Sequence, residues 1–245
     1  MVKKPIKLGV SGALGKMGSR ILSLASLDRD FKIVLALERL GHPQIGEKIE
    51  GIEVVSGRDF IKGVDCLIDF STPEATLINL IDAVRFKKAV VIGTTGFSDE
   101  QKKEILSASK KIPVLFSPNM SIGVNLLFAL TEITAAKLPK EYKVDIAEAH
   151  HVHKKDLPSG TAKFLADIVT RERSEPPTDI KSIREGEIIG DHEVIFDSPW
   201  DTVKISHSAK TRDIFAKGAL DAAKFIVAKK NGLYDMTDVL KGLKS

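Results

Sequence analysis

The sequence is poor in cysteine, tyrosine and tryptophan: its 245 residues include one cysteine, two tyrosines and one tryptophan. A single cysteine cannot form an internal disulfide, which fits a protein of the reducing cytosol. Cys66 lies in the apolar run VDCLIDF. We therefore expect a buried structural thiol at this position and not a nucleophile.

Long apolar runs are missing too. No stretch is long enough to cross a bilayer, and the opening MVKKPIKLGVSG leads into a strand-like segment without the pattern of a secretory signal. We expect a cytoplasmic protein with no membrane partner, or its equivalent in the plastid stroma if the source is a plant, although no transit segment is seen.

Dense basic clusters mixed with aromatic residues are also absent, although the formal net charge is +4. Lysines and arginines are spread along the whole chain, so we do not expect a nucleic-acid partner. A basic protein of this kind can equally bind small anions.

The first half of the chain alternates short, nearly all-apolar strands with amphipathic helices. Strands buried on both faces are typical of a parallel sheet covered by helices on each side. Pro73 is expected at the first position of one helix and Ser98 as the N-cap of another. The expected strands are Ile6–Ser11, Phe31–Glu38, Val64–Phe70, Ala89–Gly93 and Ile112–Phe116, and the expected helices Lys16–Leu27, Pro73–Phe86 and Ser98–Lys111.

The second half changes character. Segments such as Asp201–Ala209 alternate apolar and polar residues, as strands of a mixed or antiparallel sheet with one wetter face do. We predict an α/β protein with a Rossmann-type parallel-sheet domain over residues 1–121, to which residues 213–245 return, and a smaller α+β domain over residues 122–212.

Three glycines in GVSGALGKMG, namely Gly12, Gly15 and Gly18, lie between the first expected strand and the first helix. This is a G-x-x-G-x-x-G variant of the dinucleotide fingerprint, and it is weak by itself. The second strand ends at Glu38, where a carboxylate can accept hydrogen bonds from ribose hydroxyls, and Arg39 can pair with a 2′-phosphate. The pattern predicts a pyridine-nucleotide site that tolerates both NADH and NADPH; a solvated strand end is the alternative.

Three of the six histidines lie in EAHHVHKKDLPSGTA, which begins at Glu148. Neighbouring residues of an extended stretch point to opposite sides, so His150 and His151 are poorly placed to share one metal ion, and Lys154 and Lys155 would repel it. We therefore expect no metal.

We favour a site for a small carboxylate compound. Ser159 is expected to cap a helix whose first backbone N–H groups, at Gly160 and Thr161, would face an anion. Histidine can transfer a proton near neutral pH, and a neighbouring lysine can serve as a clamp or a second donor. A solvated loop is the alternative, but it does not account for the ordered Pro-Ser-Gly-Thr sequence.

Over its whole length the chain resembles the 4-hydroxy-tetrahydrodipicolinate reductase (dihydrodipicolinate reductase) family of bacterial and plant lysine biosynthesis. The resemblance depends on VSGALGKMG, ALER, FSTPEAT, GTTGF, SPNMSIGVNLL, EAHHVHKKDLPSGTA, GEIIGDHEVIF and FAKGAL. The segment with His150 and Lys154 is the most specific of these. Members reduce a cyclic dicarboxylate with NADH or NADPH and are typically homotetramers, built through the sheet of the second domain.

The resemblance implies roles for particular residues. His150 would be the proton donor and acceptor and Lys154 a proton donor, and His151, Gly160 and Thr161 would bind the substrate carboxylates. The implied cofactor residues are Gly12, Ala13, Leu14, Gly15, Lys16 and Met17 at the pyrophosphate, Glu38 and Arg39 at the adenosine ribose, and Gly93, Thr94, Thr95, Ser117, Pro118, Asn119 and Met120 on the nicotinamide side.

One departure from the family, the loss of arginine near the phosphates, bears on the preference for NADPH. Lys16 stands where many members have arginine, and FSTPEAT stands where some have FTRPEGT. Two other functions remain open from sequence: a relative that acts on another small dicarboxylate, and a nucleotide-sensing module without catalysis. The intact Pro158–Ala162 segment argues against the first, and His150 with Lys154 against the second.

Overall fold

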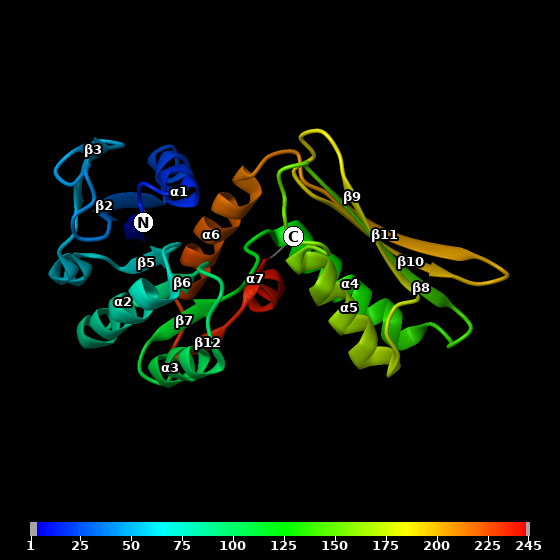
Figure 1. Cartoon of the computed structure of the whole chain (residues 1–245). Coiled ribbons are helices and arrows are strands. Elements are labelled where there is room, and N and C mark those ends of the chain that lie inside the picture. The colour runs from blue at the N-terminus through cyan, green and yellow to red at the C-terminus, as the bar shows by residue number, and fades with distance from the viewer. Residues whose placement is uncertain (1–3, 244–245) are drawn as a thin grey trace. The chain divides into compact units, whose positions relative to one another are not determined.

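The computed structural model describes residues 4–243, and the chain divides into two compact units (Figure 1). The first unit contains the chain up to Ser121 and again from Phe215, and the second unit contains Ile122–Ile214. Across residues 4–243, no helix is both long and apolar enough to span a membrane.

The first unit is built on an eight-stranded sheet with the order β12-β7-β6-β5-β1-β2-β4-β3. All of its pairs are parallel except that of β3 with β4. This confirms the expected Rossmann-type sheet. The strands are β1 (Ile6–Ser11), β2 (Phe31–Leu37), β3 (Lys48–Ile49), β4 (Ile52–Val55), β5 (Cys66–Asp69), β6 (Ala89–Ile92), β7 (Pro113–Phe116) and β12 (Gly232–Tyr234).

Helices cover both faces of this sheet. Figure 1 shows α1 (Lys16–Ser26) and α6 (Asp213–Ile226) on one side of the strands, and α2 (Pro73–Phe86) and α3 (Asp99–Ser109) on the other. Every residue of β5 and β6 is buried, because each faces a helix layer on one side or the other. Cys66 is among them, with no exposed surface, and its burial raises the pKa of its thiol. A 3₁₀ helix, η1 (Arg58–Gly63), and α7 (Met236–Gly242) complete the unit.

The helix starts follow the expected chemistry. Thr72 caps α2 by accepting a hydrogen bond from the Ala75 N–H, with Pro73 in the first turn. Ser98 and Gln101 form a reciprocal capping box at the start of α3. The predicted positions of Pro73 and Ser98 are therefore confirmed.

The second unit is a four-stranded mixed sheet with the order β11-β10-β8-β9. β8 and β9 are parallel and joined through α5, whereas the other pairs are antiparallel. The elements are α4 (Ile122–Lys137), β8 (Lys143–His150), α5 (Gly160–Arg173), β9 (Asp179–Arg184), β10 (Asp191–Asp197) and β11 (Thr202–Ser208).

Strict alternation gives this second sheet two different faces. Val144, Ile146, Val194 and Phe196 are buried, and they pack with residues of α4 and α5 in one apolar core. The residues between them in sequence are partly exposed on the opposite face. The predicted α+β unit with a mixed sheet is thus confirmed.

Three features go beyond the strands and helices predicted from the sequence. The segment between residues 182 and 198 contains the end of β9, a turn and β10, because the backbone reverses around Gly186 at φ 48°. The last helix ends at Ile226, and β12 and α7 follow it. The loop after β2 contains a short hairpin, β3–β4, whose turn residues Glu50 and Gly51 both have positive φ. Short pieces of this kind carry too few residues for a periodic signal.

The close approach of Gly18 to the glycine loop predicts a destabilising substitution. A Cβ on Gly18 would lie 2.0 Å from the carbonyl oxygen of Gly12, which is backbone and cannot move aside cheaply. We expect Gly18→Ala to lower the free energy of unfolding by about 1–3 kcal/mol, as overpacking does. Thermal unfolding of the purified variant measures this.

The matched control is Gly63→Ala in the same unit, where an added Cβ meets nothing within 4 Å. Equal melting temperatures for the Gly18 and Gly63 variants would show that the loop is not tightly packed.

Candidate functional site

A cavity of about 830 Å³ opens in the first unit at the carboxyl ends of the parallel strands. This is where open α/β sheets bind their ligands. Of the predicted cofactor residues, Gly12, Leu14, Gly15, Glu38 and Arg39 line it. The other lining residues are Ser11, Leu37, Leu40, His42, Ser56, Arg58, Phe70, Ser71, Thr72, Ala75, Ile78 and Asn79.

The glycine loop brings backbone close to the cavity wall. Gly12 has φ 73°, and a Cβ there would lie 2.3 Å from the Phe70 carbonyl oxygen. Gly15 is the N-cap of α1, and no side chain forms a capping hydrogen bond at that end. The N–H groups of the first turn and the positive end of the helix dipole therefore fit a pyrophosphate.

Charged groups line the same cavity. The Glu38 carboxylate accepts hydrogen bonds from the backbone N–H of Leu14 at 3.3 Å and of Arg39 at 3.0 Å. It is thereby tied to the glycine loop just after β2, where dinucleotide-binding sheets commonly place a ribose acceptor. Sequence reasoning missed Arg58 and His42, which line the cavity beside Arg39. No motif marks either residue, because both come from the irregular region after β2.

A buried carboxylate organises the floor of this region. Asp69, at the end of β5, has no exposed surface and accepts hydrogen bonds from Asn79 at 2.8 Å and Thr76 at 3.0 Å. The Thr94 hydroxyl also lies in this network, 3.0 Å from that of Thr76 and 3.1 Å from the Ser71 N–H. Thr94 is 4% exposed, so its side chain is engaged in holding the strand ends together.

The remaining predicted cofactor residues lie outside the cavity lining. Ala13 is fully buried, Lys16 and Thr95 are exposed, and a Cβ on Gly93 would collide with the Phe70 ring. Ser117 donates a hydrogen bond to the Asn119 carbonyl oxygen, so this segment is a compact turn. The complete set outside the lining is Ala13, Lys16, Met17, Gly93, Thr94, Thr95, Ser117, Pro118, Asn119 and Met120.

The histidine stretch lies in the second unit, at the end of β8. His150 is 7% exposed, whereas His151 is only partly buried and lies 3.3 Å, at Nε2, from a guanidinium nitrogen of Arg212. The exposed His153 pairs with Glu187 at 3.6 Å. The three histidines therefore have different surroundings.

His150 is held by a buried carboxylate that sequence reasoning did not assign. Its Nδ1 contacts Glu148 Oε2, and Glu148 Oε1 lies 2.9 Å from Arg184 Nη2. Burial by itself lowers the pKa of His150, and the contact with Glu148 opposes this; the net pKa is below 6.5. The other ring nitrogen, Nε2, faces Gly190, where an added Cβ would lie 3.0 Å away.

Lys154 and the start of α5 meet around one further carboxylate. Lys154 Nζ lies 2.8 Å from Asp156 Oδ1, and this contact, with help from the Gly160 N–H, holds the pKa of Asp156 below its usual value. Ser159 caps α5 through the Ala162 N–H, as expected. The Asp156 carboxylate lies against the Gly160 N–H, so the group predicted to face an anion already faces one that belongs to the chain itself. Thr161, in the same first turn, has a partner as well.

His192 on β10 joins this cluster. Its ring lies 5.1 Å from that of His150 in an edge-to-face arrangement, and its Nε2 lies 3.3 Å from the Ser159 hydroxyl. Burial lowers its pKa to about 4, so the ring is neutral at pH 7. No spacing in the sequence links His192 to His150, because β10 reaches β8 only through the sheet register, in which His192 pairs with Glu148.

The cluster is also the place within residues 4–243 where a metal ion could be held. Glu148, His150 and His192 each offer one ligand atom, and these atoms lie within 4.8 Å of one another. Arg184 already pairs with the Glu148 carboxylate, and Lys154 lowers the pKa of both histidines by its charge. Positive charge of this kind opposes a cation, so the arrangement fits proton transfer to a bound anion better than metal binding.

Comparison with known proteins identifies relatives over both units. Residues 6–120 match the model of the dihydrodipicolinate reductase N-terminus and residues 123–240 that of its C-terminus. A 4-hydroxy-tetrahydrodipicolinate reductase of Pelagibacter ubique is 41% identical over 97% of this chain and 98% of its own. One of Geotalea uraniireducens is 39% identical over 96% and 98%.

A solved structure shares the fold. Dipicolinate-bound dihydrodipicolinate reductase from Paenisporosarcina sp. TG-14 has a TM-score of 0.80 and 23% sequence identity, and the match covers 95% of this chain and 98% of that one. The two matching family models span nearly the whole of residues 6–240, and the relatives agree with them. The chain belongs to the dihydrodipicolinate reductase family.

Proposed function

We propose that this protein reduces (2S,4S)-4-hydroxy-2,3,4,5-tetrahydrodipicolinate to tetrahydrodipicolinate in the diaminopimelate route of lysine biosynthesis. One NAD(P)H and one proton are consumed, and the 4-hydroxyl leaves as water. The observation that carries the proposal is the buried Glu148–His150 pair beside Lys154 and the start of α5, in a chain whose relatives bear this enzyme's name.

The second unit would bind and protonate the substrate. His150 would exchange a proton through Nε2, since its Nδ1 is engaged by Glu148. Lys154 would be the second donor, and its bond to Asp156 keeps it near the start of α5. His151, Gly160 and Thr161 would bind the substrate carboxylates, which requires Asp156 to share or leave the Gly160 N–H. The substrate is a small dicarboxylate, in accord with the basic groups gathered here.

The first unit would bind the pyridine nucleotide that this family uses, and the bound nucleotide supplies the hydride. Gly12, Leu14 and Gly15 would lie along the pyrophosphate, and Glu38 would accept from the adenosine ribose. Ala13, Lys16 and Met17 belong to the same loop, and residues 93–95 and 117–120 would lie on the nicotinamide side.

Both NADH and NADPH fit the charges at the adenosine end. Arg39, Arg58 and His42 share the cavity wall with the single carboxylate of Glu38. A 2′-phosphate would meet two guanidinium groups, although the arginine that some members carry in FTRPEGT is replaced here by Thr72 of FSTPEAT. We infer that Arg58 offsets that loss.

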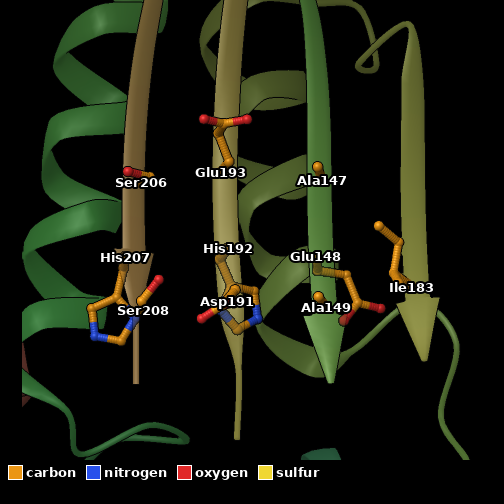
Figure 2. Close-up of a pocket in the computed structure, with 10 residues that line it drawn as sticks. All are labelled: Ala147, Glu148, Ala149, Ile183, Asp191, His192, Glu193, Ser206, His207 and Ser208. Carbon is orange, nitrogen blue, oxygen red and sulfur yellow. The ribbon is translucent and has the colours of Figure 1, made fainter. Parts of the chain in front are cut away.

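We further propose a homotetramer formed through the second sheet. α4 and α5 cover one face of it. On the opposite face small and polar residues lie beside a shallow hollow of about 230 Å³, whose lining also includes Ile183 and three residues of the core face, Glu148, His192 and His207 (Figure 2). Ala147, Glu193 and Ser206 lie side by side in register across three strands on this face. A second sheet can pack closely on side chains of this size. A cytoplasmic location is proposed with it, which the single buried Cys66 fits.

The proposed reaction is tested by following the oxidation of the cofactor by the purified protein. Substrate is generated in place from pyruvate and aspartate semialdehyde by the preceding synthase, and NADH and NADPH are run separately, with and without a chelator. We expect substrate-dependent oxidation that the chelator does not change. Cofactor binding without oxidation would support a sensor or a relative with another substrate, and loss of activity with chelator would support a metal at Glu148, His150 and His192.

Substitution of either proposed proton donor should strongly reduce turnover and leave cofactor binding unchanged. His150→Gln and Lys154→Ala each remove a group proposed to supply a proton, so we expect kcat to fall about 10²–10⁴-fold. The dissociation constant for NADH, measured by fluorescence titration, should stay unchanged, because neither residue lines the cavity of the first unit.

His153→Gln is the matched control, because His153 is exposed and forms an ion pair with Glu187. Near-normal turnover in the His150 and Lys154 variants would contradict the assignment of both.

Substitutions at the adenosine end should affect the affinities for the two cofactors to different degrees. Glu38→Ala removes an acceptor for the ribose and a repulsive charge for a 2′-phosphate, so NADH affinity should fall about tenfold and NADPH affinity should fall less. Arg58→Ala should weaken NADPH about tenfold and leave NADH nearly unchanged.

Calorimetric titration of each variant with both cofactors measures these constants, with Arg85→Ala as a control because Arg85 pairs with Asp59 away from the cavity lining. If Glu38→Ala weakens both cofactors equally, the role in ribose binding is wrong.

A further inference from the structure

We propose that Arg184 and Glu148 are positioning residues that hold His150 and the backbone of Lys154 in one arrangement. The inference deepens the proposed function and rests on it for the roles of His150 and Lys154. In this proposal neither Arg184 nor Glu148 contacts the substrate.

Arg184 links two parts of the site through one guanidinium group. Nη2 donates to Glu148 Oε1 at 2.9 Å and to the carbonyl oxygen of Asp156 at 2.6 Å, and Nε donates to the carbonyl oxygen of Lys154 at 3.3 Å. The loop that carries Lys154 is thereby bonded to the same side chain that neutralises Glu148. A lysine could pair with the carboxylate but has no planar fork with which to reach both carbonyl groups.

Glu148 contacts both Arg184 and His150. Its side chain has no exposed surface, Oε1 accepts from Arg184 and from the Ser159 N–H at 3.3 Å, and Oε2 contacts His150 Nδ1. Burial alone would raise the pKa of Glu148, but the hydrogen bonds, that from Arg184 foremost, bring it below 4.5. The carboxylate therefore stays ionised and accepts the Nδ1–H of His150, which leaves Nε2 for proton exchange.

The sheet register explains why these residues meet. His150 pairs with Arg184 across β8 and β9, and Glu148 pairs with His192 across β8 and β10. Glu148 and His150 lie two residues apart on one strand and so point to the same face. Arg184 joins Glu148 to the loop, because its guanidinium group donates to Glu148 and to the carbonyl oxygens of Lys154 and Asp156.

The charged groups around His150 oppose one another. Glu148 on β8 favours the imidazolium, whereas Lys154 in the loop and Arg184 on β9 disfavour it. His192 on β10 is neutral at pH 7, and His207 on β11 pairs with His192 in the register, with its pKa lowered by burial. Glu148 is therefore the group whose removal should shift the titration of His150 most, toward lower pH.

The test combines activity with a direct titration of His150. Histidine labelled with carbon-13 in the ring is incorporated, and the six histidines are resolved by NMR, with the His150 signal assigned from its loss in His150→Gln. Wild type, Glu148→Gln and Arg184→Lys are compared in full-length protein. For each we measure the His150 titration, the pH profile of kcat, and the dissociation constant for NADH.

We expect two different signatures. Glu148→Gln should lower the pKa of His150, shift the matching limb of the kcat profile to lower pH and reduce kcat at pH 7 at least tenfold, with NADH affinity unchanged. Arg184→Lys should leave the titration of His150 near that of wild type and still reduce kcat at least tenfold, because the Lys154 loop loses its hydrogen bonds. Arg171→Lys is the matched control in the same unit, since Arg171 pairs with Glu132 and Glu172 at the surface; it should change none of the three readouts.

Other outcomes overturn the inference. An unchanged titration and kcat profile in Glu148→Gln would show that Glu148 is structural only, and a normal kcat in Arg184→Lys would show that the loop does not depend on Arg184. If Glu148→Gln does not fold, the kcat of Arg184→Lys decides whether the inference holds. If wild type fails to reduce the proposed substrate, the proposed function is wrong, while the titrations still decide whether Glu148 controls His150.

Discussion

A buried carboxylate in each unit ties together segments that the chain brings in from distant positions, and Glu148 is the one on which the proposed chemistry depends. A fully buried charge is costly unless it is paired and hydrogen-bonded. Glu148 meets that requirement with Arg184, the Ser159 N–H and His150. The strand β8, the turn into α5 and the strand β9 must therefore hold their relative places for the charge to be tolerated. Because His150 is one of these partners, its contact with Glu148 fixes the orientation of its ring.

The first unit also contains a buried carboxylate, Asp69, which is stabilised by hydrogen bonds from uncharged side chains. Asp69 receives hydrogen bonds from Asn79, Thr76 and its neighbours at the ends of β5 and β6. Asn79 also donates to the Ser11 hydroxyl at the end of β1, so three adjoining segments are fixed beneath the cavity. A preorganised wall of this kind spares a nucleotide the cost of ordering the loops that receive it. The glycines then supply the close backbone approach that no other residue allows.

The features of the fold and the site that could be predicted are those encoded by residues close together in the sequence. The parallel sheet, Pro73 at the start of α2, the caps Ser98 and Ser159, and the buried Cys66 follow from short-range periodicity and capping chemistry, and the structure confirms them. The family was identifiable because EAHHVHKKDLPSGTA is a long, specific segment. Arg58, Arg184 and His192 were missed, because each reaches its site through strand register or an irregular loop, and no spacing in the sequence encodes that.

The position of Asp156 is the feature of the site that differs most from the arrangement expected from the sequence. Its carboxylate lies where a substrate carboxylate was expected, with Lys154 and the Gly160 N–H as partners. The most direct measurement is therefore a crystal structure of the protein with dipicolinate and NADH bound. The account predicts a dipicolinate carboxylate at the start of α5, within hydrogen-bond distance of Gly160 or Thr161, and His150 with Nδ1 still on Glu148. Dipicolinate bound elsewhere, with Asp156 and His150 unmoved and facing no ligand, would contradict it.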